Sequence, residues 1–164
     1  MNTSFTFDAM QKPVAAAILK GSDFAPDLTG IVRFYPADSG SFVSIVVRGL
    51  PELQLSDDPA KRVGPFAFHI HEGKSCGSPG VPEAFTSAGG HYNPKNLPHP
   101  LHAGDLPTIY PNHGYANMTV YTDRFTPGEV IGRTVILHKR ADDYHSQPAG
   151  NAGERIACGE IRAV

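Results

Sequence analysis

Short apolar runs separated by turn residues predict that this chain is all-β. No stretch keeps a 3.6-residue apolar period over three helical turns, whereas apolar runs of strand length recur along the chain. The clearest alternation lies at 115–121, where Ala116, Met118 and Val120 share one face. The strands predicted from these patterns are 14–20, 30–35, 42–48, 66–71, 115–121, 133–138 and 156–161.

The segments between these runs indicate the architecture. Ala-Asp-Ser-Gly at 37–40 has hairpin spacing, and Asn-His-Gly at 112–114 is a second turn signal. The chain shows no internal repeat, low-complexity tract or interior linker, so we expect one domain over 1–164 with a flexible N-terminus at 1–12. The predicted fold is an antiparallel β-sandwich or barrel.

The strand pattern fails between residues 73 and 111. This segment is dense in glycine, proline and histidine. A loop of that length in a compact domain usually has a function or an internal restraint that fixes it. We therefore expect a long loop here that is fixed by an internal restraint.

Composition narrows the classes of partner. The net charge of −2 comes with no basic stripe, so we expect no nucleic-acid partner. The longest apolar run, 14–19, is too short to cross a bilayer, so we expect no membrane partner.

The first residues have neither a basic start nor an apolar core and do not resemble a signal peptide. The expected location is the cytoplasm, or an extracytoplasmic compartment if an export signal has been removed.

Cys76 and Cys158 are the two cysteines of the chain and lie far apart in sequence. An even count at this separation is compatible with one disulfide and equally with two free thiols. The residues alone leave both alternatives open.

The segment FAFHIHEG at 66–73 carries the most informative pattern. In an extended strand His69 and His71 point to one face together with Ala67, while the bulky apolar residues point to the other. Because a buried imidazole without a partner costs free energy, metal ligation is the favoured interpretation. The competing interpretation is a surface strand with two solvated histidines.

Further candidate ligands follow, and they are His91, His99, His102, Asp105 and His138. Imidazole suits copper and zinc, and one carboxylate with three imidazoles would complete a tetrahedral zinc set. Seven ligands are one short of two four-coordinate sites, unless one imidazole serves both metals through its two nitrogens. Spacing does not say which histidine that is. For His102 and Asp105 the alternative is a capped turn without metal.

Five ordered motifs resemble the copper/zinc superoxide dismutase family over most of the chain. They are FHIHEG at 68–73, GGHYNP at 89–94, HAGDLP at 102–107, GRTVILH at 132–138 followed by ADD at 141–143, and GNAGERIACG at 150–159. His99 also follows His91 by eight residues, as the family pattern asks. The resemblance implies a Greek-key antiparallel β-barrel of about eight strands with long metal-binding loops.

The resemblance also implies how the candidate residues are used. Copper would be held by His69, His71, His91 and His138. Zinc would be held by His91, His99, His102 and Asp105, so that His91 is the shared ligand. Asp142 would link a copper-ligand and a zinc-ligand imidazole through its two oxygens. Cys76 and Cys158 would form the family's disulfide.

The implied activity is the disproportionation of superoxide to dioxygen and hydrogen peroxide by redox cycling of copper. Arg155 would attract and orient the anion, and His91 could deliver a proton. The alternative is a non-enzymatic copper- and zinc-binding protein for storage or delivery, which would need the ligands but no guiding arginine. A third hypothesis, a structural member that has lost copper, is disfavoured because all four copper positions are filled.

The chain departs from the eukaryotic pattern in two places. Two residues separate His99 from His102, so joint ligation needs a compact turn through Pro100 and Leu101. The segment 142–155 is short and lacks a run of charges, so we expect weaker electrostatic steering and a more open copper mouth.

The sequence leaves the oligomeric state open, and a homodimer is one of the alternatives. The two remaining histidines, His113 and His145, are expected to be solvated and receive no role.

Overall fold

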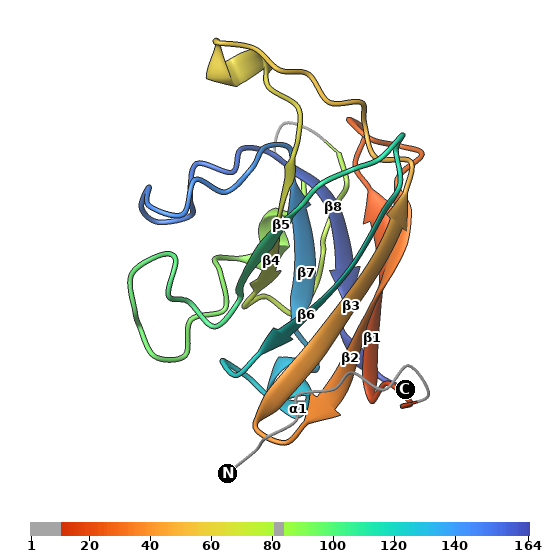
Figure 1. The fold of residues 1–164 in the computed structure, drawn as a ribbon, viewed down its shortest axis with the longest axis vertical. Coiled ribbons are helices and arrows are strands. Elements are labelled where there is room, and N and C mark those ends of the chain that lie inside the picture. Colours follow the sequence, from red (N-terminus) through yellow and green to blue (C-terminus); the bar gives the residue numbers. More distant parts are fainter. Residues whose placement is uncertain (1–10, 81–83) are drawn as a thin grey trace.

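The chain folds into a nearly closed antiparallel β-barrel with long loops on one side (Figure 1). The computed structural model describes residues 11–80 and 84–164, so most of the N-terminus predicted to be flexible lies outside the described residues. The strands are β1 (Ala15–Gly21), β2 (Thr29–Ala37), β3 (Gly40–Arg48), β4 (Phe66–His71), β5 (Asp105–Ile109), β6 (Ala116–Thr122), β7 (Thr134–His138), β8 (Arg155–Glu160) and β9 (Arg162–Ala163). The helical elements are α1 (Pro127–Val130) and the 3₁₀ turns η1 (Pro59–Lys61) and η2 (Thr86–Ala88).

The strand order around the barrel is β5-β4-β7-β8-β1-β2-β3-β6, and β9 pairs with β1. Every pair of neighbouring strands is antiparallel. The pairs β3 with β6 and β4 with β7 join strands that are not consecutive in sequence, as Greek-key connections do. The predicted all-β Greek-key fold is therefore confirmed.

Seven of these strands coincide with the seven predicted from periodicity, with boundaries that differ by two residues or fewer. The hairpin at 37–40 is present, because Ala37 pairs with Gly40 across a two-residue loop. At the second turn, His113 and Gly114 both have positive φ between the paired residues Asn112 and Tyr115. Two successive positive φ angles are the geometry of a type I′ turn.

The prediction that 73–111 is a continuous loop is wrong at its end, where β5 forms. This strand pairs with β4 at the edge of the path and contains Pro107, which has no N–H to give to a ladder. The pairing is irregular between Phe66 and Phe68, so the proline lies opposite a bulge. An edge position with a bulge is where proline is tolerated in a sheet, and it hid the strand from the periodicity.

The barrel interior is filled by the apolar faces of the strands. Phe66, Phe68 and Ile70 of β4 are fully buried in the main core, as the alternation predicted. His69 and His71, on the opposite face of β4, are 0% and 1% exposed. The alternative of a surface strand with solvated histidines is therefore wrong.

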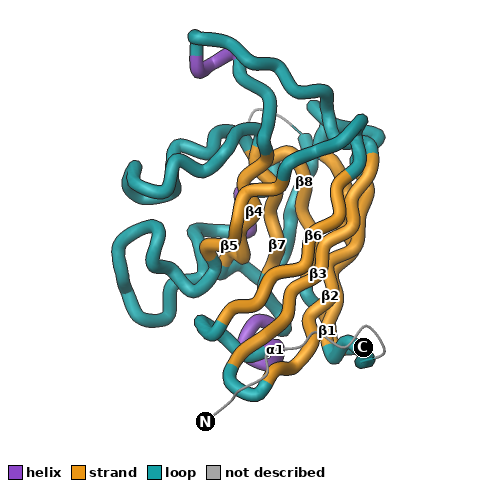
Figure 2. Tube along the Cα trace, viewed as in Figure 1, coloured by secondary structure: helices purple, strands orange, loops and turns teal. Residues whose placement is uncertain are grey.

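Loop segments cover that second face of β4. The segment 90–104 before β5 and the segment 139–154 between β7 and β8 extend from the same side of the barrel (Figure 2). In the described residues, 11–80 and 84–164, no helix is long and apolar enough to cross a lipid bilayer.

Candidate metal centre

Four elements bring the predicted ligands together. His69 and His71 lie on β4, beside β7, which ends at His138. Asp105 begins β5 and pairs with His69. His91 lies in the loop but pairs with His71 through an isolated bridge, which brings the glycine- and proline-rich segment back against the barrel. Strand pairing therefore places five of the seven predicted ligands within the fold, all but His99 and His102.

The first group of potential ligands contains His69, His71, His91 and His138. Their candidate ligand atoms all lie within 4.8 Å of one another, and none of the four residues is more than 8% exposed. The second group contains His91, His99, His102 and Asp105, within the same limit. His91 belongs to both groups, so the geometry brings all seven predicted ligands into two adjoining clusters.

Hydrogen bonds determine which nitrogen of each ring is free in the first group. The Nδ1–H of His71 donates to the carbonyl of Gly89 at 2.9 Å, and the Nδ1–H of His138 donates to the carbonyl of Gly153 at 3.1 Å. The two Nε2 atoms, which lie 3.3 Å apart, are then both acceptors in neutral rings. Two acceptors cannot bond to each other, whereas a cation can accept both lone pairs.

The other two rings complete the same pattern. Nε2 of His69 donates to Oδ2 of Asp142 at 2.9 Å, which leaves its Nδ1 as the free atom. Nδ1 of His91 lies 2.7 Å from Oδ1 of Asp105, which leaves its Nε2. Nδ1 of His69 and Nε2 of His91 are buried and have no hydrogen-bond partner among the described residues. Buried polar atoms of a folded protein are normally paired, so these residues fit a bound metal ion.

The second group has distances suited to a tetrahedral ion. Nδ1 of His91 lies 3.4 Å from Nδ1 of His102, and Oδ2 of Asp105 lies 3.3 Å from Nδ1 of His102 and 3.0 Å from Nδ1 of His99. Two nitrogens bound to zinc at 2.0–2.1 Å with a tetrahedral angle are about 3.3 Å apart. Three imidazoles with one carboxylate therefore form a donor set that fits zinc.

Asp142 connects the two groups from outside. Its Oδ2 accepts from Nε2 of His69 and its Oδ1 accepts from Nε2 of His99, both at 2.9 Å. Burial favours a higher pKa for Asp142, but the hydrogen bonds from His69, the Tyr144 backbone N–H and His99 outweigh it and hold the pKa far below its ordinary value. The carboxylate is therefore ionised and fixes the tautomers of both rings.

Three histidines of the first group, His69, His71 and His138, are held neutral because their pKa values are lowered. Burial, followed by repulsion from neighbouring imidazoles, lowers the pKa of His71 and His138 well below 6.5. Burial also lowers the pKa of His69, although Asp142 opposes that shift. A neutral imidazole has the lone pair that a metal requires, so these rings are ready to bind a metal at neutral pH.

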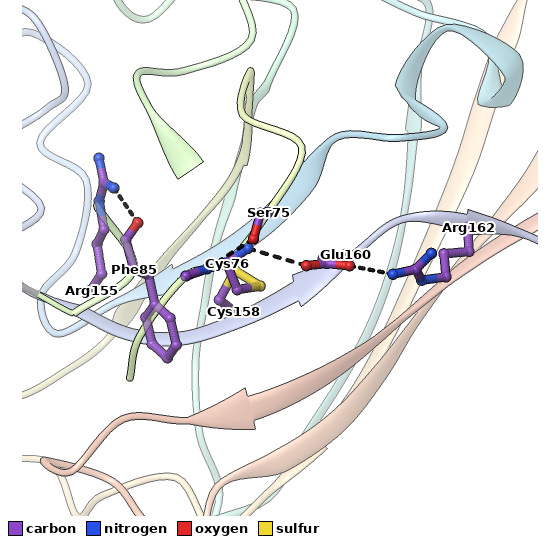
Figure 3. Close-up of a disulfide and its surroundings, with 8 residues drawn as sticks. Ser75, Cys76, Phe85, Arg155, Cys158, Glu160 and Arg162 are labelled. Atoms are coloured by element: carbon purple, nitrogen blue, oxygen red, sulfur yellow. Dashed lines mark hydrogen bonds and ion pairs between the residues drawn. A yellow bond between two sulfur atoms is a disulfide. The ribbon is translucent and has the colours of Figure 1, made fainter. Parts of the chain in front are cut away.

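Arg155, the first residue of β8, lies beside this group. Its guanidinium donates to the carbonyl of Phe85 at 2.6 Å (Figure 3). It also donates to the carbonyl of Gly89 at 2.6 Å, which accepts from His71 as well. The positive charge of Arg155 is one cause of the lowered pKa of His71 and His138. Arg155, Gly89 and Gly153 line one cavity of about 540 Å³.

Comparison with known proteins identifies the family. A family model described as copper/zinc superoxide dismutase (SODC) matches residues 28–161. The chain belongs to the copper/zinc superoxide dismutase family. It is 35% identical to the Cu-Zn superoxide dismutase of Deinococcus radiodurans, over 100% of this chain and 92% of that protein. It is 36% identical to Cu-Zn superoxide dismutase 2 of Aquifex aeolicus, over 83% of this chain and 80% of that protein.

A solved structure agrees with this assignment. The Cu/Zn superoxide dismutase from Brucella abortus aligns with a TM-score of 0.70 and 27% identity, over 89% of this chain and 98% of that chain. This superoxide dismutase therefore uses copper and zinc, and it disproportionates superoxide to dioxygen and hydrogen peroxide by copper redox cycling. The alternative of a non-enzymatic metal-storage protein is not favoured, because the matched relatives are dismutases.

A disulfide ties the loop of this superoxide dismutase to the barrel. Cys76 and Cys158 are bonded, which confirms the pairing implied by the resemblance. The backbone N–H of Cys76 also donates to Glu160 at 3.4 Å, and Glu160 pairs with Arg162 (Figure 3). The ring of Phe85 and the methyl of Ala88 pack with Cys158 in a small apolar cluster. The segment that presents the Phe85 and Gly89 carbonyls to Arg155 is thereby held against β8.

Several supporting groups of this superoxide dismutase carry no sequence signal. The carbonyls of Gly89 and Gly153 orient two rings, yet a backbone carbonyl has no residue type to recognise. Gln147 and Arg124, which hold the segment carrying His99 and His102, are single polar residues far from it in sequence. His113 and His145 are exposed and lie outside both ligand groups, as expected.

Proposed function

We propose that His69, His71, His91 and His138 hold the catalytic copper of this enzyme. The ligand atoms are Nδ1 of His69 and Nε2 of the other three rings. The observation that carries this assignment is the pair of facing Nε2 acceptors, His71 and His138, beside two buried ring nitrogens that have no partner within 11–80 and 84–164. Bound copper supplies the alternating one-electron acceptor and donor that the dismutation of superoxide requires.

Zinc is held by Nδ1 of His91, His99 and His102 and by the carboxylate of Asp105. The close contacts between Asp105 and the three imidazoles support this set. Burial favours a higher pKa for Asp105, but the hydrogen bond with His91 and the electrostatic interactions with the three imidazoles lower it, so the carboxylate stays ionised as a ligand must. Asp142 keeps Nε2 of His99 and of His69 protonated and directs the opposite nitrogen of each ring inward.

Arg155 binds and orients the substrate. Superoxide is a small anion, and a guanidinium remains positively charged at every working pH. Two carbonyl acceptors, Phe85 and Gly89, fix the Arg155 side chain next to the ring of His71. The charge thus raises the local concentration of the anion beside the copper ligands.

His91 holds and releases one of the two protons that hydrogen peroxide requires. The proton is carried on Nε2, on the side of His71 and His138, while Nδ1 remains on the side of Asp105. A ring that is anchored on one nitrogen keeps its orientation when the other nitrogen changes its partner. The substrate is superoxide, and the absence of nucleic-acid and membrane partners stays an expectation from composition.

The shared role of His91 can be tested by adding the two metals in turn. Electron paramagnetic resonance of the copper(II)-loaded protein is recorded before and after zinc is added, and superoxide removal is assayed on the same samples. If His91 serves both ions, zinc changes the copper(II) spectrum and activity exceeds that of the same amount of free copper. An unchanged spectrum with zinc bound would contradict the shared ligand.

A further inference from the structure

The segment that carries three of the four zinc ligands, 99–105, is short and only partly self-supporting. Two residues separate His99 from His102. Three bonds close its turn: the backbone N–H of Leu101 to the carbonyl of Pro98 at 2.8 Å, the backbone N–H of Asp105 to the carbonyl of His102 at 3.2 Å, and the backbone N–H of His102 to Oδ2 of Asp105 at 3.0 Å. None of the three holds the N–H or the carbonyl of His99.

The side chain of Gln147 bonds to both backbone groups of His99. The N–H of His99 donates to Oε1 of Gln147 at 3.0 Å, and Nε2 of Gln147 donates to the carbonyl of His99 at 2.6 Å. Gln147 lies 48 residues further along the chain, on the same 139–154 segment as Asp142. His99 is therefore fixed by its backbone through Gln147 and by its ring through Asp142.

Arg124 holds the rest of the segment from the barrel side. Its Nη1 lies 3.0 Å from the carbonyl of Pro100, 3.0 Å from that of His102 and 3.3 Å from that of Asp105. One cationic nitrogen thus donates toward three carbonyls of the ligand segment, and hydrogen bonds from a charged donor are stronger than neutral ones. Arg124 follows β6, so it also joins the segment to the far end of the strand path.

We propose that Gln147 and Arg124 are positioning residues for zinc. Their hydrogen bonds hold the zinc ligands in place, as the contacts of a longer loop would otherwise do. This inference rests on the zinc set assigned above. His99 is 3% exposed, so removing the amide of Gln147 leaves a buried N–H and a buried carbonyl unpaired. The 99–105 segment can then adopt other conformations. Zinc binding must select the conformation in which the ligands converge, and this lowers the zinc affinity.

The two contacts are directed at the zinc side of the centre. The side-chain bonds of Gln147 reach His99 and His145, and those of Arg124 reach Pro100, His102 and Asp105. Among the described residues, neither side chain hydrogen-bonds to His69, His71 or His138. Gln147 also lines a cavity of about 400 Å³ beside His138, so copper affinity must be measured together with zinc affinity.

The test compares Gln147→Met and Arg124→Met with matched controls on the same full-length chain. Gln11→Ala removes another amide-to-carbonyl bond, to Pro36, and Arg62→Met removes another arginine that bonds backbone carbonyls, those of Ser56 and Asp57. Zinc and copper dissociation constants are measured by chelator competition, and the visible spectrum of the cobalt(II)-substituted protein reports the geometry of the zinc site. Unfolding of the metal-free proteins is recorded in parallel.

The proposal predicts that zinc affinity falls roughly 10- to 100-fold in both test variants, the size expected for groups that orient metal ligands. The cobalt spectrum should change, and copper affinity and both controls should not. Arg124→Lys should recover part of the loss, because an ammonium still donates to carbonyls. Gln147→Glu should not, because its carboxylate would face the carbonyl of His99.

Three results would overturn the proposal. Unchanged zinc affinity in both test variants would do so, as would an equal fall in copper and zinc affinity. A loss of zinc affinity that is fully matched by a loss of stability in the metal-free protein would indicate a general structural role. If instead the unmodified protein binds no zinc at these residues, the ligand assignment itself has failed.

Discussion

Nε2 of His71 lies 3.3 Å from Nε2 of His138, and the other nitrogen of each ring donates to a backbone carbonyl. Two neutral acceptors that face each other this closely are unfavourable unless a cation or a proton lies between them. The surrounding fold nevertheless imposes this contact, because β4 and β7 are paired and Gly89 and Gly153 fix the ring orientations. Strand pairing thus holds two lone pairs close together, and a bound cation would relieve their repulsion.

This contact predicts that the metal-free protein loses stability in mild acid. The folded pKa of His71 and of His138 is depressed below 6.5, so as the pH falls through 6.5 the unfolded chain binds protons that the folded chain does not. The free energy of unfolding should therefore be steady above that pH and decrease below it. Urea unfolding of the metal-free protein from about pH 8 to about pH 5 measures this, across the ordinary titration range of histidine.

The variant His138→Gln provides the control, because a neutral amide does not titrate. Its free energy of unfolding should depend less on pH over the same interval. An equally steep dependence would show that these rings are not the source of the acid sensitivity.

Asp142→Asn should weaken the binding of both metals. One carboxylate of this residue accepts from His69 and from His99, and an amide cannot accept on both sides. A loss of roughly 10- to 100-fold in each affinity is expected for a group that orients ligands. Chelator competition with copper and with zinc measures the two affinities separately.

Asp143→Asn is the matched control, since the side chain of Asp143 caps His145 and Ser146 and, among the described residues, hydrogen-bonds to no assigned ligand. Those hydrogen bonds from Ser146 hold the pKa of Asp143 at about 2, so the substitution should alter local stability but not metal affinity. Loss of a single metal in Asp142→Asn would show that the carboxylate does not couple the two sites.

Arg155→Met should slow superoxide removal without releasing either metal. The charge of Arg155 is the cation that the site offers to the substrate, and electrostatic attraction of this kind changes association rates by roughly 10-fold or more. The second-order rate constant should fall and depend less on ionic strength, while copper and zinc contents stay at those of the parent. Arg155→Lys should lie between the two, because lysine keeps the charge but not the fork that bonds Phe85 and Gly89.

Arg48→Met, at the exposed end of β3, removes the same charge from a distant strand and should leave the rate unchanged. A rate constant for Arg155→Met equal to that of the parent would contradict the guiding role of Arg155. The steep salt dependence of a strongly steered enzyme is not expected even in the parent, because the short 142–155 segment lacks a run of charges.

Replacing Cys76 and Cys158 by serine together should lower the free energy of unfolding by about 2–5 kcal/mol, since the bond closes a loop across 82 residues of sequence. Activity should also fall, because the bond holds the segment whose Phe85 and Gly89 carbonyls fix Arg155. Denaturant unfolding and the superoxide assay measure the two effects. Unchanged activity in a destabilised double variant would show that the loop keeps Arg155 in place without the disulfide.

The sequence predicts the ligands better than it predicts what holds them. His69 and His71 could be assigned to a common face because strand alternation is a local rule, and the seven long strands follow from the same rule. β5 could not be found in this way, since Pro107 and the bulge beside it break the alternation. The edge position that tolerates the proline exists only in the folded barrel.

The supporting contacts fail to be predicted for a related reason. Gln147 acts on His99 across 48 residues, and Arg124 acts on His102 across 22. An isolated glutamine or arginine is an ordinary surface residue until the fold places an unpaired backbone group beside it. The disulfide is predicted only in part. The cysteine count is compatible with a disulfide or with two thiols, and the family resemblance alone implies the pairing of Cys76 with Cys158.

Metal binding by His138→Ala tests the two-site assignment most directly. Copper and zinc are titrated into this variant and into the parent, and the bound amount of each is determined. The assignment predicts that the variant keeps zinc near the parent's amount while copper and superoxide removal are lost, because His138 belongs to the first ligand group and not the second. Equal loss of both metals, or retention of copper with full activity, would contradict it.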